Sequence, residues 1–423
     1  MNPAELKNKF KALWKDTFRD SDAYVSLVFD SYFNPDLVAY EEMSGDIVAA
    51  LLGVPYEFGN ADRRIRGLYL CGLATKPQFR SRGIMTRLLA SINEKAARLG
   101  YAFTFLIPAD KGLRKYYHDR DYVNAFYRVS DNYTSIHDFN REYESILMEQ
   151  KEKVAELKRR YFASLTTGTI NREHPDNATS KHVAALIRRI ENEQGDCRLY
   201  HSDRDIEILI KENMVSNGDV IYVRNSGGDL TAAAFVDPHY RSEVKVLNIY
   251  FADLASRYKV LGGVKAAYPD AAMSVLVSSV DMDRKALWQR TYAGTMPENA
   301  KVSEVSVAER VYSLAAHSKV YGMARILNLH EILKFQASIR NDVKYSILVK
   351  GEDSYIVNQI NVADGKIKVK KLTYDELTPS QAMYVMSQRD VSEILFRLRD
   401  ADSIITEALG IPSINASACL LLD

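Results

Sequence analysis

The segment Arg80–Thr86 (RSRGIMT) has residue types and spacing that are suited to binding a phosphate group. The apolar, partly alternating residues 65–75 before it predict a strand. Apolar residues recur every three or four positions from Met85 to Leu99, which predicts a helix. The N–H groups at that helix N-terminus, its dipole and the two arginines would converge on an anion, and Gly83 would allow close approach. We interpret the segment as a pyrophosphate-binding loop; the alternative is an ordinary basic turn between strand and helix.

Composition limits the class of protein. The 423 residues are too many for one ordinary core and predict two to four domains. A content of 47% hydrophobic and 26% charged residues is typical of a soluble globular protein. The net charge of +1 gives no general electrostatic reason to bind nucleic acid. The longest apolar stretches are shorter than the ~20 residues needed to span a membrane. We therefore expect no nucleic-acid partner and no membrane span.

Cysteine and histidine usage predicts neither a disulfide framework nor a metal centre. Cys71, Cys197 and Cys419 lie far apart in the sequence and lack the spacing of metal ligands. The histidines show no ligand pattern either. We expect no bound metal and a reduced, cytoplasmic compartment.

The N-terminal part of the chain predicts a mixed α/β domain around the Arg80–Thr86 loop. Helices are expected over residues 4–18, 22–33, 85–99 and 110–118, and strands over 37–43, 47–58, 65–75, 101–107 and 122–130. The residues around Gly45 indicate a hairpin between the first two strands. The loop would follow the third strand in this order.

The remainder of the chain predicts two further mixed regions. Residues 139–165 predict one long amphipathic helix that links domains, the alternative being a solvated helix of no special role. Residues 166–312 repeat the mixed order without a counterpart of the basic loop; Gly262 and Gly263 indicate a turn there, with a phosphate loop as the alternative. The C-terminal region predicts a helix at 330–337, a three-strand meander (345–349, 354–361 and 367–371) and helices at 380–386 and 390–398.

The loop and the order of elements together resemble the GNAT family of acyl-CoA-dependent N-acyltransferases. The family motif is Arg/Gln-x-x-Gly-x-Gly/Ala; Arg80 and Gly83 fit it, and Met85 occupies the last small position. The agreement in element order extends over about 130 residues, which makes it more specific than the glycine motif alone. The resemblance implies a mixed, splayed central sheet with flanking helices.

The whole chain is similar to the enhanced-intracellular-survival (Eis) acetyltransferases of that family. The local matches are Pro77–Met85, Tyr116–Tyr122 and Met323–Leu329, and the Eis type tolerates a large apolar residue where Met85 stands. The resemblance implies three domains: a catalytic GNAT domain at residues 1–135, a second GNAT-like domain without a CoA site at 136–312, and a smaller α+β sterol-carrier-protein-like domain at 313–423. It also suggests a symmetric homo-oligomer.

The resemblance assigns roles to individual residues. Backbone groups of Leu73, Ala74 and Thr75 would pair with the pantetheine arm of CoA. The cofactor-binding loop would be formed by Arg80, Ser81, Arg82, Gly83, Ile84, Met85 and Thr86. Tyr117 would be the general acid that protonates the departing thiolate, the alternative being that it only packs. The α-carboxylate of Asp423 would be the general base. The chain ends in aspartate where the family has an aromatic residue, so Glu57 is an alternative base or a solvated strand-end charge.

These expectations define an acetyl-CoA-dependent N-acetyltransferase. A deprotonated primary amine would attack the thioester directly, and the acceptor would be a small polyamine, an aminoglycoside-like amine or a lysine side chain. One alternative is a non-catalytic protein that binds acyl-CoA or lipid. Another is a protein N-acetyltransferase.

Overall fold

The computed structural model describes residues 1–278 and 319–396, except 61, 149, 172, 174, 194–196, 241, 340, 341, 352 and 354, together with Ile414. No helix in this part of the chain is long and apolar enough to cross a membrane. The described residues form two compact units. The first is built from residues within 1–128, 195–200 and 283–418, and the second from residues within 129–194 and 201–282.

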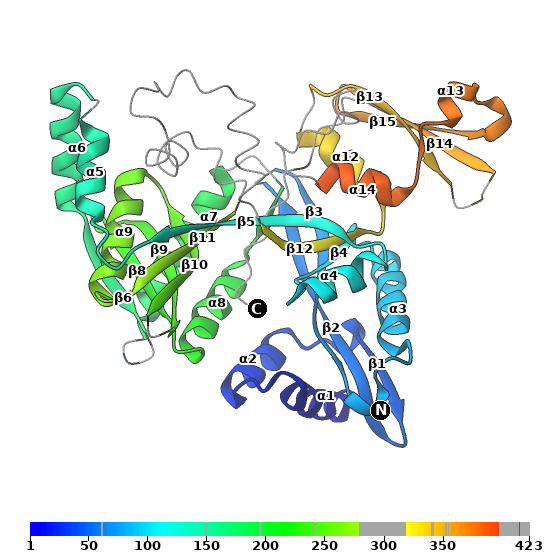
Figure 1. The fold of residues 1–423 in the computed structure, drawn as a ribbon, viewed down its shortest axis with the longest axis horizontal. Coiled ribbons are helices and arrows are strands. Elements are labelled where there is room, and N and C mark those ends of the chain that lie inside the picture. The colour runs from blue at the N-terminus through cyan, green and yellow to red at the C-terminus, as the bar shows by residue number, and fades with distance from the viewer. Residues whose placement is uncertain are drawn as a thin grey trace. The chain divides into compact units, whose positions relative to one another are not determined.

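The N-terminal part of the first unit has the predicted element order (Figure 1). In chain order its main elements are α1 (Pro3–Phe18), α2 (Asp22–Tyr32), β1 (Val38–Met43), β2 (Asp46–Gly59), β3 (Arg64–Thr75), α3 (Ile84–Arg98), β4 (Phe103–Leu106), α4 (Lys111–His118) and β5 (Val123–Tyr133). Asn2 and Ser21 cap α1 and α2 with their side chains. Strands β1, β2 and β3 pair antiparallel, whereas β4 is parallel to β3 because α3 connects the two.

A β-bulge in β3 lies just before the loop. In β2, Ala50 pairs with Ala74 of β3, but Leu52 pairs with Cys71 of β3. Two steps along β2 thus correspond to three along β3, so β3 has one extra residue at this point. Gly72 lies in the bulge with φ +60°, and a Cβ there would come within 2.0 Å of the Trp14 ring of α1. Glycine is required at this position because both the backbone conformation and the packing exclude a side chain.

One strand of the first sheet comes from far along the chain. Strand β12 (Lys319–Ile326) lies between β4 and β5 and is antiparallel to both (Figure 1). Its residues Met323, Ala324 and Ile326 are buried. The short strand β7 (Arg198–Tyr200) pairs with the end of β2. Neither strand is among those predicted from the sequence.

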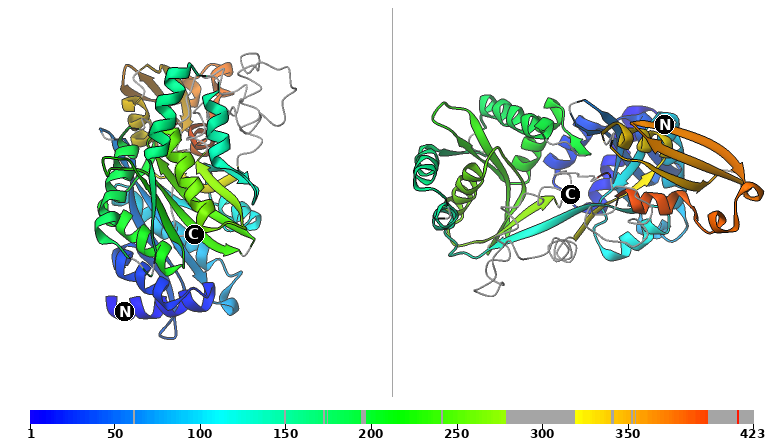
Figure 2. Two further views of the ribbon diagram at one scale, coloured as in Figure 1. Left: turned by 90° about the vertical axis from the view of Figure 1, so that its left-hand side faces the viewer. Right: turned by 90° about the horizontal axis from the view of Figure 1, so that it is seen from above.

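The C-terminal elements form a smaller sheet, drawn in orange in Figures 1 and 2. They are α12 (Leu329–Ile339), β13 (Tyr345–Lys350), β14 (Ile356–Ala363), β15 (Lys366–Thr373), α13 (Pro379–Ala382), β16 (Val385–Met386) and α14 (Gln388–Phe396), with strand order β15-β14-β13-β16. The predicted meander is confirmed. The helix predicted over 380–386 is too long, because the chain leaves it to pair β16 with β13. Phe396 of α14 contacts Phe103 and Phe126, which joins this region to the first sheet.

The second unit repeats the mixed order, which confirms the tandem α/β fold. Its elements are α5 (Phe139–Leu147), α6 (Glu152–Ser164), β6 (Thr166–Ile170), α7 (Asn177–Glu193), α8 (Asp203–Val215), β8 (Asp219–Arg224), β9 (Leu230–Tyr240), β10 (Glu243–Phe251), α9 (Leu254–Ala267) and β11 (Ala272–Ser278). Helix α9 connects the parallel pair β10 and β11, as α3 connects β3 and β4. The boundaries of the three domains expected from the sequence stay a prediction.

Two local expectations in the second unit are wrong. The single helix expected over 139–165 is two helices, and the chain folds back so that the rings of Tyr143 and Phe162 stack with centroids 4.4 Å apart. Gly262 and Gly263 lie inside α9 rather than in a turn. A Cβ on Gly263 would come within 3.1 Å of Thr167 and Ile221, so this glycine allows close packing of α9 on the sheet.

Candidate active site

The Arg80–Thr86 loop places an uncapped helix N-terminus at the end of β3. Gly83 is the N-cap residue of α3 with φ +71°, and Ser81 also has a positive φ of 60°. Among the described residues, no side chain caps this helix, and its first helical bond is donated by the Arg87 N–H to the Gly83 carbonyl. The N–H groups of residues 84–86 therefore remain available to an anion. Alternating backbone conformations of this kind form concave anion-binding sites.

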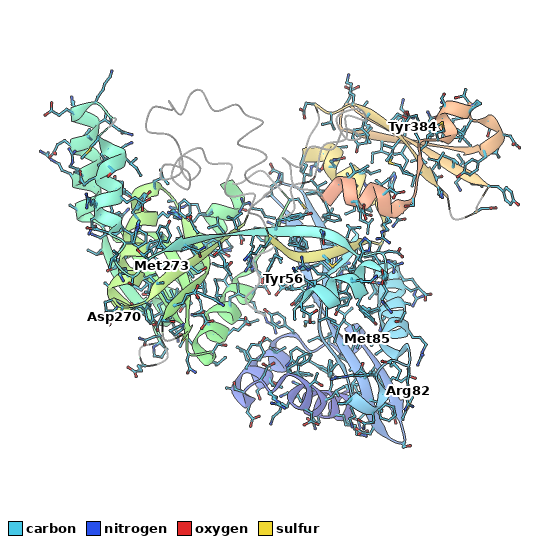
Figure 3. All side chains as sticks on the ribbon, viewed as in Figure 1. Tyr56, Arg82, Met85, Asp270, Met273 and Tyr384 are labelled. Carbon is cyan, nitrogen blue, oxygen red and sulfur yellow. The ribbon has the colours of Figure 1, made fainter. Side chains whose placement is uncertain are left out.

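Positive charge surrounds this helix end. Arg80 and Arg82 are exposed; the Arg80 Nε donates to the Thr75 carbonyl at 3.1 Å, and Arg82 lies over the Phe79 ring. Figure 3 shows Arg82 and Met85 at the start of α3. Arg87, which the sequence analysis did not select, donates to the Arg82 carbonyl at 3.3 Å and pairs with Glu41. Its position as the fourth residue of α3, one helical turn from the loop, is the sequence feature that could have identified it.

The sheet opens beside the loop. Strand β3 pairs with β4 only from Gly67 to Tyr69, and β4 ends at Leu106, whereas β3 continues to Thr75. The segment of β3 that contains Leu73, Ala74 and Thr75 thus extends beyond its β4 partner and pairs with β2 on the other side. A free strand edge can accept an extended ligand through backbone hydrogen bonds.

Tyr117 lies in the last turn of α4 and belongs to the same core cluster as Ile84. Its side chain is 6% exposed and contacts the rings of Tyr116 and Tyr122. Burial raises the pKa of the Tyr117 phenol above its ordinary value of about 10. Among the described residues, no group forms a hydrogen bond with its hydroxyl. The phenol is therefore protonated at neutral pH, and within the described ranges its proton is not committed to a protein acceptor.

A polar network that the sequence analysis missed joins α4 to the first turn of α3. The Arg120 guanidinium donates to Thr86 Oγ1 from Nε at 3.0 Å and from Nη2 at 2.7 Å. Its Nη1 donates to the Tyr116 carbonyl at 2.6 Å, and its plane lies 3.5 Å from the Tyr116 ring centroid. The Tyr116 hydroxyl is 3.3 Å from Thr86 Oγ1. Thr86 is a predicted site residue and Tyr116 is adjacent to one, but their contacts with Arg120 depend on the packing of two helices.

The two candidate bases differ in what the structure says of them. Asp423 lies outside the described residues. Glu57 lies eight positions along β2 from Ala49, the partner of Thr75, so it is roughly 26 Å from the loop at about 3.3 Å per strand residue. Its carboxylate pairs with Arg64 at 3.0 Å and is half exposed. This agrees with a solvated strand-end charge.

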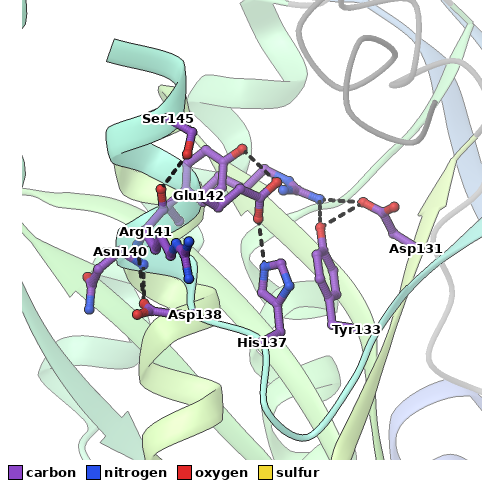
Figure 4. Close-up of polar contacts among 10 residues, drawn as sticks. Asp131, Tyr133, His137, Asp138, Asn140, Arg141, Glu142 and Ser145 are labelled. Atoms are coloured by element: carbon purple, nitrogen blue, oxygen red, sulfur yellow. Dashed lines mark hydrogen bonds and ion pairs between the residues drawn. The ribbon is translucent and has the colours of Figure 1, made fainter. Parts of the chain in front are cut away.

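The N-terminus of α9, at the corresponding place in the second unit, is closed. Its cap is Asp253, which accepts from the Ser256 N–H at 2.8 Å and from the Tyr161 hydroxyl at 2.9 Å. Residues 254–257 (LASR) nevertheless resemble residues 84–87 (IMTR). Arg257 is fully buried and pairs with Asp131 at 2.8 Å. Figure 4 shows this polar cluster, which also contains the contact between His137 and Glu142.

A known protein family matches the N-terminal part of the first unit. Residues 3–124 match the family model described as an acetyltransferase (GNAT) domain. Together with the mixed sheet and the uncapped α3 N-terminus, this match identifies residues 3–124 as a GNAT acetyltransferase domain, which favours an enzyme over a non-catalytic binding protein. GNAT domains use acetyl-CoA as the acyl donor. Within the described residues, no group of three His, Cys, Asp or Glu side chains could hold a metal ion.

Solved structures share the fold along most of the chain. A GCN5-related N-acetyltransferase from Kribbella flavida has a TM-score of 0.60 at 10% identity, covering 99% of this chain and 98% of that one. One from Anabaena variabilis has a TM-score of 0.59 at 12% identity, covering 92% and 87%. Eis1 from Mycobacterium abscessus has a TM-score of 0.54 at 10% identity, covering 91% and 88%. No curated protein sequence matches the chain.

Proposed function

We propose that the protein transfers the acetyl group of acetyl-CoA to a primary amine. The observation that carries the proposal is the uncapped N-terminus of α3 at the end of β3, where Gly83 leaves the backbone open. Arg80 and Arg82 add exposed positive charge on the same loop. An anion with several negative charges, such as the pyrophosphate of CoA, is the ligand that such a site favours.

The remainder of CoA would extend along the open edge of β3. Backbone groups of Leu73, Ala74 and Thr75 would pair with the amides of the pantetheine arm. The thioester would then approach α4, because Tyr117 packs in the same cluster as the start of α3. Tyr117 is thus a candidate to meet the sulfur atom.

The reaction that we infer is a direct transfer. The lone pair of a neutral amine attacks the thioester carbonyl carbon, a C–N bond forms, and the C–S bond breaks. The sulfur leaves as a thiolate and takes a proton from the Tyr117 phenol, while the amine gives up a proton to a base. The products are an N-acetylated amine and free CoA, and no covalent enzyme intermediate is required.

The α-carboxylate of Asp423 is the base that we propose, on the strength of the Eis resemblance alone. Extending the chain by three residues after Asp423 would move this carboxylate away from the site. We expect turnover to fall at least tenfold, with no change in thermal unfolding. Unchanged turnover would exclude the terminal carboxylate. A matched control replaces Asp423 by Asn, which keeps the α-carboxylate.

The acceptor class is a polyamine, an aminoglycoside-like amine or a lysine side chain. We propose further that the C-terminal region is sterol-carrier-like, that the protein is cytoplasmic, and that it forms a homo-oligomer.

The experiment that tests the main proposal is an amine-library screen with acetyl-CoA and detection of the free thiol. Amine-dependent thiol release with a matching N-acetyl product is expected. Its absence from small amines, lysine peptides and proteins alike would contradict the proposal.

A further inference from the structure

The Arg120 side chain is half-buried and fully engaged by protein groups at the junction of α3 and α4. Both Nε and Nη2 donate to the single oxygen of Thr86, and Nη1 donates to the Tyr116 carbonyl. The guanidinium also stacks on the Tyr116 ring. A planar group with several donors is required for this arrangement, and a lysine ammonium could not reproduce it.

Arg120 connects Thr86 with Tyr116, and these two residues belong to the parts of the site that must be aligned. Thr86 is in the first turn of α3, whose N–H groups face the bound anion in the proposed reaction. Tyr116 precedes Tyr117, whose phenol must reach the sulfur atom of the same cofactor. Arg120 therefore holds the Tyr117 phenol in a defined position relative to the first turn of α3, where the cofactor would bind.

The turn that carries Arg120 is itself restrained from β12. Asp121 has a φ of +63°, a conformation that costs a non-glycine residue roughly 1 kcal/mol. Arg325 of β12 donates to the Arg120 carbonyl at 3.1 Å and pairs with the Asp121 carboxylate at 3.3 Å. These contacts hold the Arg120–Asp121 turn in one conformation, so the Arg120 side chain starts from a fixed backbone.

We propose that Arg120 is a positioning residue, which holds the Tyr117 phenol in line with a cofactor bound at the first turn of α3. The inference rests on the proposed function, because it requires Tyr117 to act as the acid. It predicts that Arg120 affects turnover through Tyr117 and through the forked contact with Thr86, rather than through its charge alone.

Three substitutions separate geometry from charge. Arg120→Met removes both, whereas Arg120→Lys keeps the charge and loses the paired hydrogen bonds to Thr86. Both Arg120 variants should lower kcat roughly 10- to 100-fold, the effect expected of a reacting group that is misplaced by about 1 Å, with a smaller change in KM for acetyl-CoA. The control Lys115→Met removes an exposed charge from α4, the helix that precedes Arg120, and should leave kcat within about twofold. Full activity of Arg120→Lys would overturn the inference.

Thr86 provides a second test that does not alter Arg120. Thr86→Val removes the acceptor oxygen and should lower kcat about tenfold, whereas Thr86→Ser keeps the oxygen and should restore kcat. Both variants keep the backbone N–H that faces the anion. Equal activities of the Val and Ser variants would overturn the inference, since the hydroxyl would then have no role.

A double-mutant cycle with Tyr117→Phe distinguishes a positioning role from general destabilisation. Once the phenol is gone, Arg120→Met should lower kcat by less than about twofold. Suppose that Tyr117→Phe lowers kcat, and that Arg120→Met lowers kcat by the same factor in the wild-type chain and in Tyr117→Phe. Then the positioning role of Arg120 fails, but Tyr117 remains the proposed acid. If Tyr117→Phe alone leaves kcat unchanged, the proposed acid fails with it.

A spectroscopic measurement makes the test independent of turnover. With 3-fluorotyrosine at position 117, the ¹⁹F resonance of the holoprotein with CoA should be single and sharp. Arg120→Met and Thr86→Val should shift or broaden it, and Lys115→Met should not. An unchanged resonance in Arg120→Met would overturn the inference.

Discussion

Met323 of β12 pairs with Leu106 of β4, so a strand that follows the second unit in the chain lies inside the first sheet. On its other edge, Met323 pairs with Asn124 of β5. The side chain of Met323 is 1% exposed and belongs to the core cluster that also contains Ile84 and Tyr117. The sheet formed by β4 and β5 is thus completed only when residues 319–326 are present.

This relationship predicts that a fragment of residues 1–135 does not fold independently. Without β12, the edges of β4 and β5 that pair with it lose their backbone partners, and buried apolar side chains become exposed. We expect the fragment to aggregate or to lack a cooperative thermal transition, which circular dichroism measures. A fragment with a sharp transition and normal acetyl-CoA binding would contradict this prediction.

Tyr117→Phe tests the proposed acid, because it keeps the ring and removes only the hydroxyl. If the phenol protonates the thiolate in the transition state, kcat should fall by roughly 10²–10⁴. The Kd of acetyl-CoA should hardly change, since the contact becomes important only as charge develops on sulfur. Tyr127→Phe, which also removes a tyrosine hydroxyl in the first unit, is the control. Full turnover of Tyr117→Phe would show that the thiolate leaves unassisted.

The pH dependence of turnover follows from the raised pKa of Tyr117. Burial stabilises the neutral phenol, so the acid form persists above the ordinary tyrosine pKa of about 10. Turnover should therefore rise with pH as the amine acceptor loses its proton, without a descending limb up to about pH 11, one unit above the ordinary tyrosine pKa. A descending limb in that range that disappears in Tyr117→Phe would mean that the phenol ionises at its ordinary value or below.

Gly72→Ala tests the bulge that precedes the loop. The new Cβ would lie 2.0 Å from the Trp14 ring, whose indole N–H is held by Asp20 at 2.7 Å. Overpacking and the positive φ together should lower the free energy of unfolding by about 2–4 kcal/mol. Denaturant unfolding measures this loss. Gly45→Ala is the control, because it also has a positive φ but nothing lies within 4 Å of the new Cβ. Equal losses in the two variants would show that the Trp14 contact does not matter.

The sequence predicted the parts of the fold that depend on local patterns. The apolar face of α3 and the turn at Gly45 identify the N-terminal elements to within a few residues. Strand β12 could not be predicted in the same way. Its residues also fit a strand of the C-terminal region, and only pairing with β4 and β5 decides where it lies.

The site shows the same division. Gly83 and the basic residues beside it were visible because a helix N-terminus needs particular residue types at fixed positions. Arg120 was not visible, because its function depends on the distance between α4 and α3. At Gly263 the sequence predicted a turn, because glycine often marks one, but in the structure this glycine provides room for helix-to-sheet packing.

Calorimetry with acetyl-CoA tests the central claim most directly, because it measures both the affinity and the number of sites. One site per chain is expected, since Asp253 closes the N-terminus of α9 in the second unit. Gly83→Glu should abolish binding by bulk and negative charge. The matched control Gly262→Glu, where nothing lies within 4 Å of the new Cβ, should bind normally. Undiminished affinity in Gly83→Glu, or a stoichiometry near two, would contradict the claim.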